Sequence, residues 1–336
     1  MKFLALALFT ILALAACSQE SPLPDSKNVA QSRANVGFTC SREADRLPAL
    51  DPDADAVFRY GRYLHTRDGP KDFNEVARYY RIAAAHGHYK ANHNVQQLVS
   101  SGFADSPSAA HEAVEWATRL VEQGIPAGYY DIGYYLKSGY GLKQDPEMAL
   151  KYIRKAADLG NADAQYHVSD LLAQNRTELD VSDLMLRCAA DQGHGQAAYE
   201  LGVYREDDRK FNESLLAYQK GVMAGNSASA SSLAESFLDR PDARELYFLD
   251  VRRDLERSRR YEMIRKFLSE NELSNPKVPD IDKIVPLPPA QLPPWDGTFE
   301  WEKAHARIPP KPSDELIERL AKERNLDSST GLPLTP

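Results

Sequence analysis

The sequence predicts an all-α protein: an α-solenoid of about six helix pairs with a Pro-rich C-terminal strap and a short helix. The first observation behind this is a glycine that recurs at separations of 37, 36, 33 and 32 residues, at Gly87, Gly124, Gly160, Gly193 and Gly225. The second is a small residue four positions after each glycine, where a new helix can begin. A helix pair of this length cannot bury its apolar face alone, so neighbouring pairs stack into a solenoid.

The N-terminal residues 1–16 have the pattern of a secretory signal peptide. Lys2 supplies a positive charge, and the apolar run that follows it, residues 3–13, is too short to span a membrane as a mature helix. We expect this segment to be removed on export.

Leu14-Ala15-Ala16-Cys17 resembles a bacterial lipobox, in which the cysteine thiol accepts diacylglycerol. Ordinary signal cleavage beside an incidental cysteine is the alternative. Ser18 stands where Asp would signal inner-membrane retention, which resembles Gram-negative lipoproteins sent to the outer membrane. The resemblance implies an outer membrane lipoprotein that faces the periplasm, with acyl chains on Cys17 as its only membrane attachment.

Residues 17–52 are polar and interrupted by proline, and they predict a tether and an extended lead-in to the repeats. Cys40 lies in this lead-in, and Cys188 lies in the second helix of the fourth unit at the position of Lys155 in the third, which predicts partial exposure. A Cys40–Cys188 disulfide would suit an oxidising compartment. It would require the lead-in to run along about three repeats and the Cα atoms to approach within about 7 Å. Two separate thiols are the alternative.

The repeats occupy residues 53–271, and the unit from Gly128 to Gly160 has the clearest pattern. Ile132 and Leu136 are four residues apart and share one face of its first helix. Gly133 has no side chain, which would let a second helix approach closely. Other units carry the same spacing at Tyr60/Leu64, Val95/Val99, Val168/Leu172 and Leu233/Phe237, with Leu201/Arg205 as the exception.

The second helix of this unit has signals at both ends. Gly139-Tyr140-Gly141 predicts a turn with positive φ. Asp145 predicts the N-cap and Pro146 the first helical residue, where a missing N–H has no cost. Gly160 predicts the end. The inner face would contain Ala149, Tyr152, Ile153, Ala156 and Ala157.

The sixth unit departs from the others because residues 240–253 form an insertion between its helices. We expect its second helix to follow Asp254, with Ile264 and Leu268 on the inner face. Six arginines crowd this region: Arg252, Arg253, Arg257, Arg259, Arg260 and Arg265. A solvated helix with ion pairs to interspersed carboxylates is the first interpretation, and a basic docking patch is the second.

The C-terminal module, residues 272–336, is rich in proline and should be extended. Trp295, Phe299 and Trp301 favour burial, so we predict a strap that packs along the solenoid and caps its last repeat. Ser313 would begin a short helix with an apolar stripe of Leu316, Ile317, Leu320 and Leu326, and residues 330–333 would end it in a turn.

These residues together carry a family resemblance. Ile132-Gly133, the Gly139–Gly141 turn, Asp145, Lys155-Ala156-Ala157 and Gly160-Asn161-Ala162 resemble the Sel1-like repeat, a relative of the tetratricopeptide repeat. The match is strong in this unit and partial in the others. The resemblance implies an α-solenoid used for protein–protein interaction.

The whole arrangement is similar to a family of proteobacterial lipoproteins with a C-terminal domain of unknown function. The lipobox, the repeats, the motif Trp295-Asp296-Gly297-Thr298-Phe299-x-Trp301 and the tail motif at 330–334 carry this resemblance. Some members are periplasmic immunity proteins for type VI secretion phospholipase effectors. The resemblance implies stoichiometric binding and occlusion of such a toxic effector, with a general periplasmic scaffold for envelope proteins as the alternative.

Motifs for catalysis or cofactors are absent from the sequence. It contains no GxSxG, P-loop, GxGxxG or HExxH, and no pair of carboxylates stands out. His86, His88 and His93 are the only metal-like group, and no carboxylate or cysteine lies near enough in sequence to complete a site, so a polar turn is favoured over a metal. The net charge of −8 argues against nucleic acid. We therefore predict no enzyme, no cofactor and no metal.

One tyrosine cluster is the candidate partner-binding site. Five tyrosines fall within twelve residues: Tyr129, Tyr130, Tyr134, Tyr135 and Tyr140. They cannot all face inward on one helix, so some should line a surface, where tyrosine offers a large contact area with few rotatable bonds. Ordinary packing between repeats is the alternative.

Overall fold

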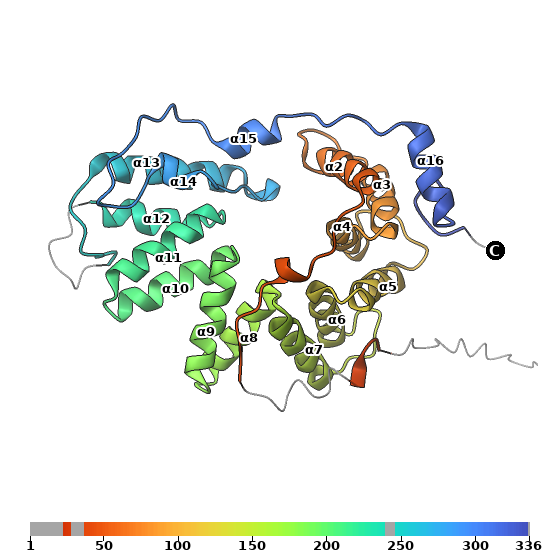
Figure 1. The fold of residues 1–336 in the computed structure, drawn as a ribbon, viewed down its shortest axis with the longest axis horizontal. Coiled ribbons are helices and arrows are strands. Elements are labelled where there is room, and N and C mark those ends of the chain that lie inside the picture. The colour runs from red at the N-terminus through yellow and green to blue at the C-terminus, as the bar shows by residue number, and fades with distance from the viewer. Residues whose placement is uncertain (1–22, 28–36, 239–245, 335–336) are drawn as a thin grey trace, which may run out of the picture.

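The computed structural model describes residues 23–27, 37–238 and 246–334, and it contains the six predicted helix pairs (Figure 1). The signal peptide and Cys17 lie outside the described residues. The pairs, in chain order, are α2 (Pro52–Thr66) with α3 (Phe73–Ala85), α4 (Tyr89–Ser100) with α5 (Ala109–Glu122), α6 (Pro126–Ser138) with α7 (Pro146–Leu159), α8 (Ala162–Gln174) with α9 (Leu179–Asp191), α10 (Gly195–Asp207) with α11 (Phe211–Met223), and α12 (Ser227–Ser236) with α13 (Leu255–Glu270). The all-α solenoid prediction is confirmed. Within the described ranges, no helix has the length and apolar character needed to cross a bilayer.

The predicted signals of the third pair are confirmed. The Asp145 carboxylate accepts a hydrogen bond of 2.9 Å from the Met148 N–H, and Pro146 is the first residue of α7. Gly139 and Gly141 both have positive φ, at 76° and 68°. The five predicted inner-face residues of α7 are all buried: Ala149, Tyr152, Ile153, Ala156 and Ala157.

Gly133 allows α6 and α7 to pack closely. A Cβ atom at this position would lie 2.7 Å from Ile153 Cγ1 and 3.1 Å from the Ala149 carbonyl oxygen. Real side chains essentially never approach so closely, so the closest contact of this pair depends on the absence of a side chain.

The first helices of the pairs share a start that the sequence interpretation missed. The residue directly after a closing glycine caps the next helix, and its side chain accepts the backbone N–H three residues on. This residue is His88 in α4, Asn161 in α8, His194 in α10 and Asn226 in α12, with hydrogen bonds of 3.1, 2.8, 3.0 and 2.7 Å. In α6 the position holds Ile125, and Pro126 begins the helix without an N–H to satisfy.

The exceptional pair Leu201/Arg205 is explained by two ion pairs that a buried arginine makes with more exposed carboxylates. Arg205 is 7% exposed, and its guanidinium lies 3.0 Å from Glu213 and 2.5 Å from Asp183. Carboxylates from α9 and α11 thus compensate a charge that occupies an apolar position in the other units.

The lead-in runs along the inner side of the arc, and the Cys40–Cys188 disulfide is present with Cα atoms 5.7 Å apart. A short 3₁₀-helix, η2 (Glu43–Arg46), follows the bridge. The prediction that Cys188 is partly exposed is wrong: the residue is 2% exposed, because the lead-in covers it.

The lead-in also attaches to the third and fourth pairs through Glu43. Its backbone N–H donates to the Gly160 carbonyl at 3.1 Å. Its carboxylate accepts hydrogen bonds from the Ala127 N–H (2.9 Å) and the Asn161 amide (3.0 Å), while burial raises the pKa of this carboxyl. Glu43 therefore holds the inner edges of two pairs together.

The strap caps the last repeat as predicted, and the predicted inner face of α13 is confirmed. Asp254 is the N-cap of α13, and Ile264 and Leu268 are buried. A single apolar cluster joins them to the strap, which includes η3 (Glu272–Ser274) and α14 (Ile281–Ile284); the strap contributes Val278, Ile281, Ile284, Val285 and Phe299. The predicted boundary between the repeats and the C-terminal module, at residues 271 and 272, therefore falls within a continuous apolar core.

Two arginines of α13 fix the strap, so the interpretation as a solvated helix with ion pairs is wrong for these two residues and correct for Arg259 and Arg265. Arg257 and Arg260 are 8% and 7% exposed, so they form neither a solvated face nor a docking patch. Arg260 donates to the carbonyls of Ile284 (2.7 Å) and Pro293 (2.8 Å), and Arg257 donates to those of Pro286 (3.3 Å) and Ala290. Prolines cannot donate, so their segment exposes carbonyls, and arginine supplies the missing donors. Arg259 and Arg265 do lie on the surface, each paired with a carboxylate of α13.

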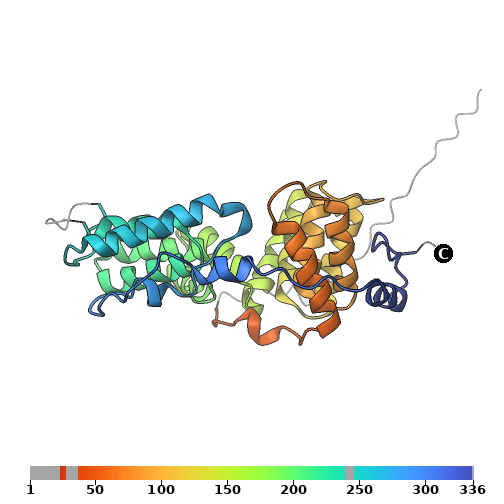
Figure 2. The same ribbon diagram turned by 90° about the horizontal axis from the view of Figure 1, so that it is seen from above.

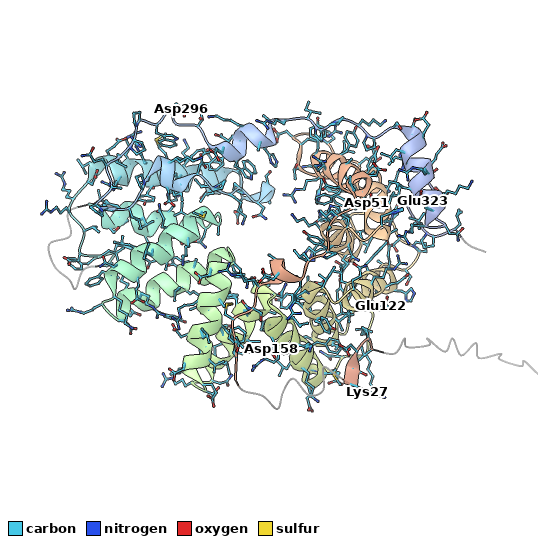
Figure 3. The ribbon with its side chains drawn as sticks, in the orientation of Figure 1. Lys27, Asp51, Glu122, Asp158, Asp296 and Glu323 are labelled. Atoms are coloured by element: carbon cyan, nitrogen blue, oxygen red, sulfur yellow. A yellow bond between two sulfur atoms is a disulfide. The ribbon has the colours of Figure 1, made fainter. Side chains whose placement is uncertain are left out.

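Beyond the strap, the chain closes the arc into a ring. α15 (Glu300–His305) leaves the sixth pair, an extended stretch crosses to the first pair, and α16 (Asp314–Glu323) packs against the far side of α3 (Figures 1 and 2). Figure 3 shows the two ends of this path, with Asp296 on the strap and Glu323 on α16 far apart. Ser313 caps α16 as predicted, and Ile317, Leu320 and Leu326 join the core of the first four pairs.

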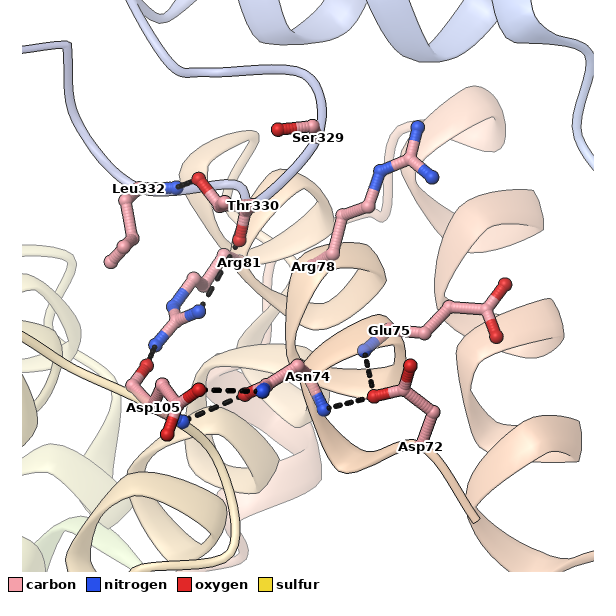
Figure 4. A pocket seen from close by; sticks show the side chains of 9 residues that line it. All are labelled: Asp72, Asn74, Glu75, Arg78, Arg81, Asp105, Ser329, Thr330 and Leu332. Carbon is pink, nitrogen blue, oxygen red and sulfur yellow. Dashed lines mark hydrogen bonds between the residues drawn. The ribbon is translucent and has the colours of Figure 1, made fainter.

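Arg81 of α3 anchors the last turn of the chain (Figure 4). This buried side chain donates to the carbonyls of Thr330 (3.2 Å) and Asp105 (2.7 Å) and forms an ion pair of 2.7 Å with Glu112. Gly331 rests on the same helix, where a Cβ atom would lie 2.7 Å from Arg81 Cβ. The C-terminal turn therefore fits α3 by shape and by hydrogen bonding.

The segment 23–27 also lies against the solenoid, on the α6–α7 side, where Figure 3 labels Lys27. The Tyr129 hydroxyl donates to Asp25 at 2.8 Å, and the Tyr152 hydroxyl donates to the Pro24 carbonyl. Leu23 packs against the core of the first four pairs. The tether is thus attached at the third pair before the lead-in begins.

Candidate protein-binding surface

Two of the five clustered tyrosines are interior residues. Tyr129 and Tyr135 are 5% and 7% exposed. The Tyr135 hydroxyl donates to the Gln96 side chain at 2.9 Å, and Tyr129 holds Asp25 as described above. For these two residues the structure favours the packing alternative over contact with a partner.

The other three tyrosines reach the surface, in line with the argument that all five cannot face inward. Tyr134 is 58% exposed. Tyr130 is half-buried with its ring edge-on to His167 of α8 at 6.1 Å, and Tyr140 lies 5.7 Å from the Tyr135 ring. Two tyrosines of the cluster therefore belong to the core, and the other three reach solvent on α6 and the turn that follows it.

That face continues onto the next two pairs through a repeat that the sequence interpretation missed. A tyrosine stands six residues after each of three consecutive closing glycines, at Tyr130, Tyr166 and Tyr199. Tyr199 packs against the apolar cluster of the last pairs, so on α10 the face continues at the exposed Tyr204 instead. Counting from the closing glycine would have revealed the row, because this offset lies between the buried positions of the first helix. In Figure 1, α2, α4 and α6 lie nearer the centre of the ring than α3, α5 and α7, as expected for first helices of a solenoid.

Carboxylates accompany the tyrosines on α8 and α10. Glu200 accepts hydrogen bonds from the Tyr166 hydroxyl (2.6 Å) and from Gln196 (2.9 Å). Asp170 accepts one from Gln174 at 2.6 Å, and Asp207 lies close enough to affect Tyr204. We define the tyrosine–carboxylate face by its seven residues: Tyr130, Tyr134, Tyr166, Asp170, Glu200, Tyr204 and Asp207.

The carboxylates of this face lack cationic partners. Across the part of the chain that the structure describes, no lysine or arginine lies within 4 Å of the carboxylates of Asp170, Glu200 or Asp207. The acids just beside the face differ, because Asp131 lies 3.7 Å from His93 and Asp163 lies 3.3 Å from His194.

Three tyrosines of the face, Tyr130, Tyr166 and Tyr204, have raised pKa values and are neutral donors. Burial raises the pKa of Tyr130 to about 12. Burial, and then the Glu200 carboxylate, raise the pKa of Tyr166, and burial with the nearby Glu200, Asp170 and Asp207 raises that of Tyr204. The face thus offers phenol rings and hydroxyls beside fixed negative charge.

The three histidines singled out from the sequence point to different neighbours. His86 Nε2 lies 2.9 Å from the Leu320 carbonyl, and His88 caps α4 with its ring stacked on Phe58 at 4.1 Å. His93, on α4, lies 3.7 Å from the Asp131 carboxylate of α6. Over the described ranges, no group of three or more His, Cys, Asp or Glu side chains is arranged to hold a metal ion.

Comparison with known families identifies the class of this protein. Residues 54–88 and 126–161 match the Sel1 repeat. Residues 229–334 match a domain of unknown function, DUF6396, which begins at the sixth helix pair and includes the strap and α16. The chain is therefore an α-solenoid in which two segments match the Sel1 repeat and the C-terminal part matches this domain.

Solved structures with the same architecture come from Pseudomonas aeruginosa. The chain is 28% identical to Pseudomonas aeruginosa 5086 (PA5086), with a TM-score of 0.61 over 76% of this chain and 96% of that one. It is 28% identical to immunity protein Pa5087, with a TM-score of 0.60 over 75% and 95% of the chains. It is 25% identical to immunity protein PA5088, with a TM-score of 0.62 over 76% and 95%. The predicted resemblance to Sel1-type immunity proteins is confirmed.

Proposed function

We propose that this protein is an immunity protein that binds a toxic secreted effector, a type VI phospholipase, and blocks it stoichiometrically. The observation that carries the proposal is the likeness to two immunity proteins over 75–76% of this chain and 95% of theirs. The likeness extends over most of both chains, so more than one repeat is shared.

The fold supports a blocking role because it is rigid before binding. The strap, the lead-in disulfide and α16 each connect parts of the chain that are distant in sequence. A preformed surface loses little conformational entropy on association, which favours tight binding at a given contact area.

We also propose that the protein is an outer membrane lipoprotein that faces the periplasm, attached through Cys17. The lipobox supports attachment, and the Cys40–Cys188 disulfide suits an oxidising compartment rather than a reducing one. Acyl chains on one cysteine would supply a stable anchor.

The test is a pull-down of residues 18–336 from cells that express the adjacent open reading frame, followed by a lipase assay on the complex. We expect one stoichiometric partner whose lipid hydrolysis stops when the complex forms. Full lipase activity in the complex would refute the proposal. Several weak partners without a lipase among them would favour the general periplasmic scaffold instead.

A further inference from the structure

We propose that the tyrosine–carboxylate face on α6, α8 and α10 docks a segment of the effector that carries lysine or arginine. This inference rests on the proposed function and specifies the chemistry of the partner. Three observations carry it: the exposure of the tyrosines, the lack of lysine or arginine partners for the carboxylates, and the contacts that hold the face in place.

The first observation is aromatic exposure. Tyr134 on α6 and Tyr204 on α10 are 58% and 44% exposed, and α8 lies between these two first helices in the series. Tyrosine is enriched among the residues that dominate binding energy, because its ring contributes a large area and orders only two side-chain torsions. Its ring face also attracts a guanidinium or ammonium group.

The second observation is the imbalance of charge. Asp170, Glu200 and Asp207 have no lysine or arginine within ion-pair distance among the described residues, whereas the arginines of α13 and Arg154 of α7 all have nearby carboxylates. Covering unpaired carboxylates with an apolar or acidic surface would remove their hydration without compensation. A basic segment supplies the charge that these carboxylates lack.

The third observation is that the face is already held in place. The Tyr166 hydroxyl and the Gln196 amide orient the Glu200 carboxylate, and the ring of Tyr130 packs on His167. Behind Tyr134, Tyr135 is fixed by Gln96. The same negative charge disfavours anionic lipid headgroups and nucleic acid as occupants. One cation, Lys137, lies near His167 at the edge of the face.

The experiment measures binding of an inactive form of the lipase encoded beside this gene, by biolayer interferometry in 50 mM and 300 mM salt. The first variant combines Asp170→Asn, Glu200→Gln and Asp207→Asn, which keep shape and remove charge. The second is Tyr134→Ala. Glu318→Gln on α16 and Phe103→Ala, whose side chain is 60% exposed, are the matched controls away from the face.

We expect the neutralised variant to associate about tenfold more slowly in low salt and to lose most of the salt dependence of the unmodified protein. Tyr134→Ala should bind about tenfold more weakly. The controls should match the unmodified protein, and unchanged Tm values would show that all variants are folded.

The possible failures are distinguishable. If the unmodified protein inhibits the lipase and both face variants bind equally well, the docking surface is elsewhere while the proposed function stands. If the unmodified protein does not bind the lipase at all, both proposals are overturned. Restored binding between Glu200→Lys and a Lys→Glu variant of the lipase would establish the pairing directly.

Discussion

At the scale of single residues, the caps of the first helices show one role performed by two residue types. His88 and His194 cap through Nδ1, and Asn161 and Asn226 cap through the amide oxygen. Both place an acceptor within reach of the same backbone N–H. Only the histidine version responds to pH near neutrality, because protonation of Nδ1 removes the acceptor.

His88 should therefore make stability depend on pH. Burial lowers the pKa of this histidine below its usual value, against the opposing effect of Asp55. The folded state then binds a proton less readily than the unfolded state, so its contribution to stability is complete above about pH 6.5 and is lost as the pH falls below that value. We expect the loss of Tm between pH 7 and pH 5 to be smaller in His88→Asn, which preserves the cap. An equal loss in both proteins would contradict this account.

Gly133 supports a second prediction at this scale. Gly133→Ala would place a Cβ atom 2.7 Å from Ile153 Cγ1, and such overpacking costs about 1–3 kcal/mol, beyond the gain that alanine brings to an exposed helix. Urea denaturation should show a lower midpoint than for the unmodified protein. Lys137→Ala, an exposed change on the same helix, is the control and should shift stability by less than about 0.5 kcal/mol.

At the scale of elements, the helices and their turns could be predicted because their signals are local. Asp145, Pro146 and Gly160 act on residues within one turn of themselves, and the inner face of α7 follows from spacing alone. The roles of Arg257 and Arg260 could not be predicted in this way, since their acceptors lie 24 to 33 residues later in the chain. Their spacing resembled that of a solvated helix because Glu256 does pair with Arg259 and Arg260.

Arg260→Ala tests the attachment of the strap. The substitution leaves the carbonyls of Ile284 and Pro293 without this donor, and a buried unsatisfied group costs about 1–3 kcal/mol. We expect a loss of about 2–4 kcal/mol in chemical denaturation. Arg260→Lys should not restore it, because one ammonium group cannot reproduce the planar fork of donors. Arg259→Ala, which removes an exposed ion pair with Glu256 and a contact with the Met263 sulfur, should lower stability far less than Arg260→Ala.

At the scale of the whole molecule, closure changes how the repeats depend on one another. An open solenoid has contacts only between neighbouring pairs, so its ends can unfold separately. Here α16 places Ile317 and Leu320 in the core of the first pairs, while the strap continues from the core of the sixth. The sequence predicted α16 but not its location, because an amphipathic stripe shows that a face is buried without showing what buries it.

Removal of residues 306–336 should open the ring. We expect a larger radius of gyration by small-angle X-ray scattering and a lower Tm, with the first pair losing hydrogen-exchange protection first. Lys311→Ala, an exposed change within the same stretch, is the control and should alter neither quantity. A truncated chain with unchanged dimensions would show that the solenoid holds its curvature without the closing segment.

The attachment of residues 23–25 to the third pair limits how far the folded protein can lie from its membrane anchor. With Cys17 acylated as proposed, only the five residues 18–22 separate the anchor from Leu23, and the six steps from Cys17 to Leu23 span at most about 20 Å. A protein with so short a tether cannot move away from the membrane into the periplasm. Under this proposal the protein stays at the inner surface of the outer membrane, where it is confined to a two-dimensional layer. An effector that enters through that membrane would meet it at once, whereas one delivered deeper into the cell envelope would pass it by.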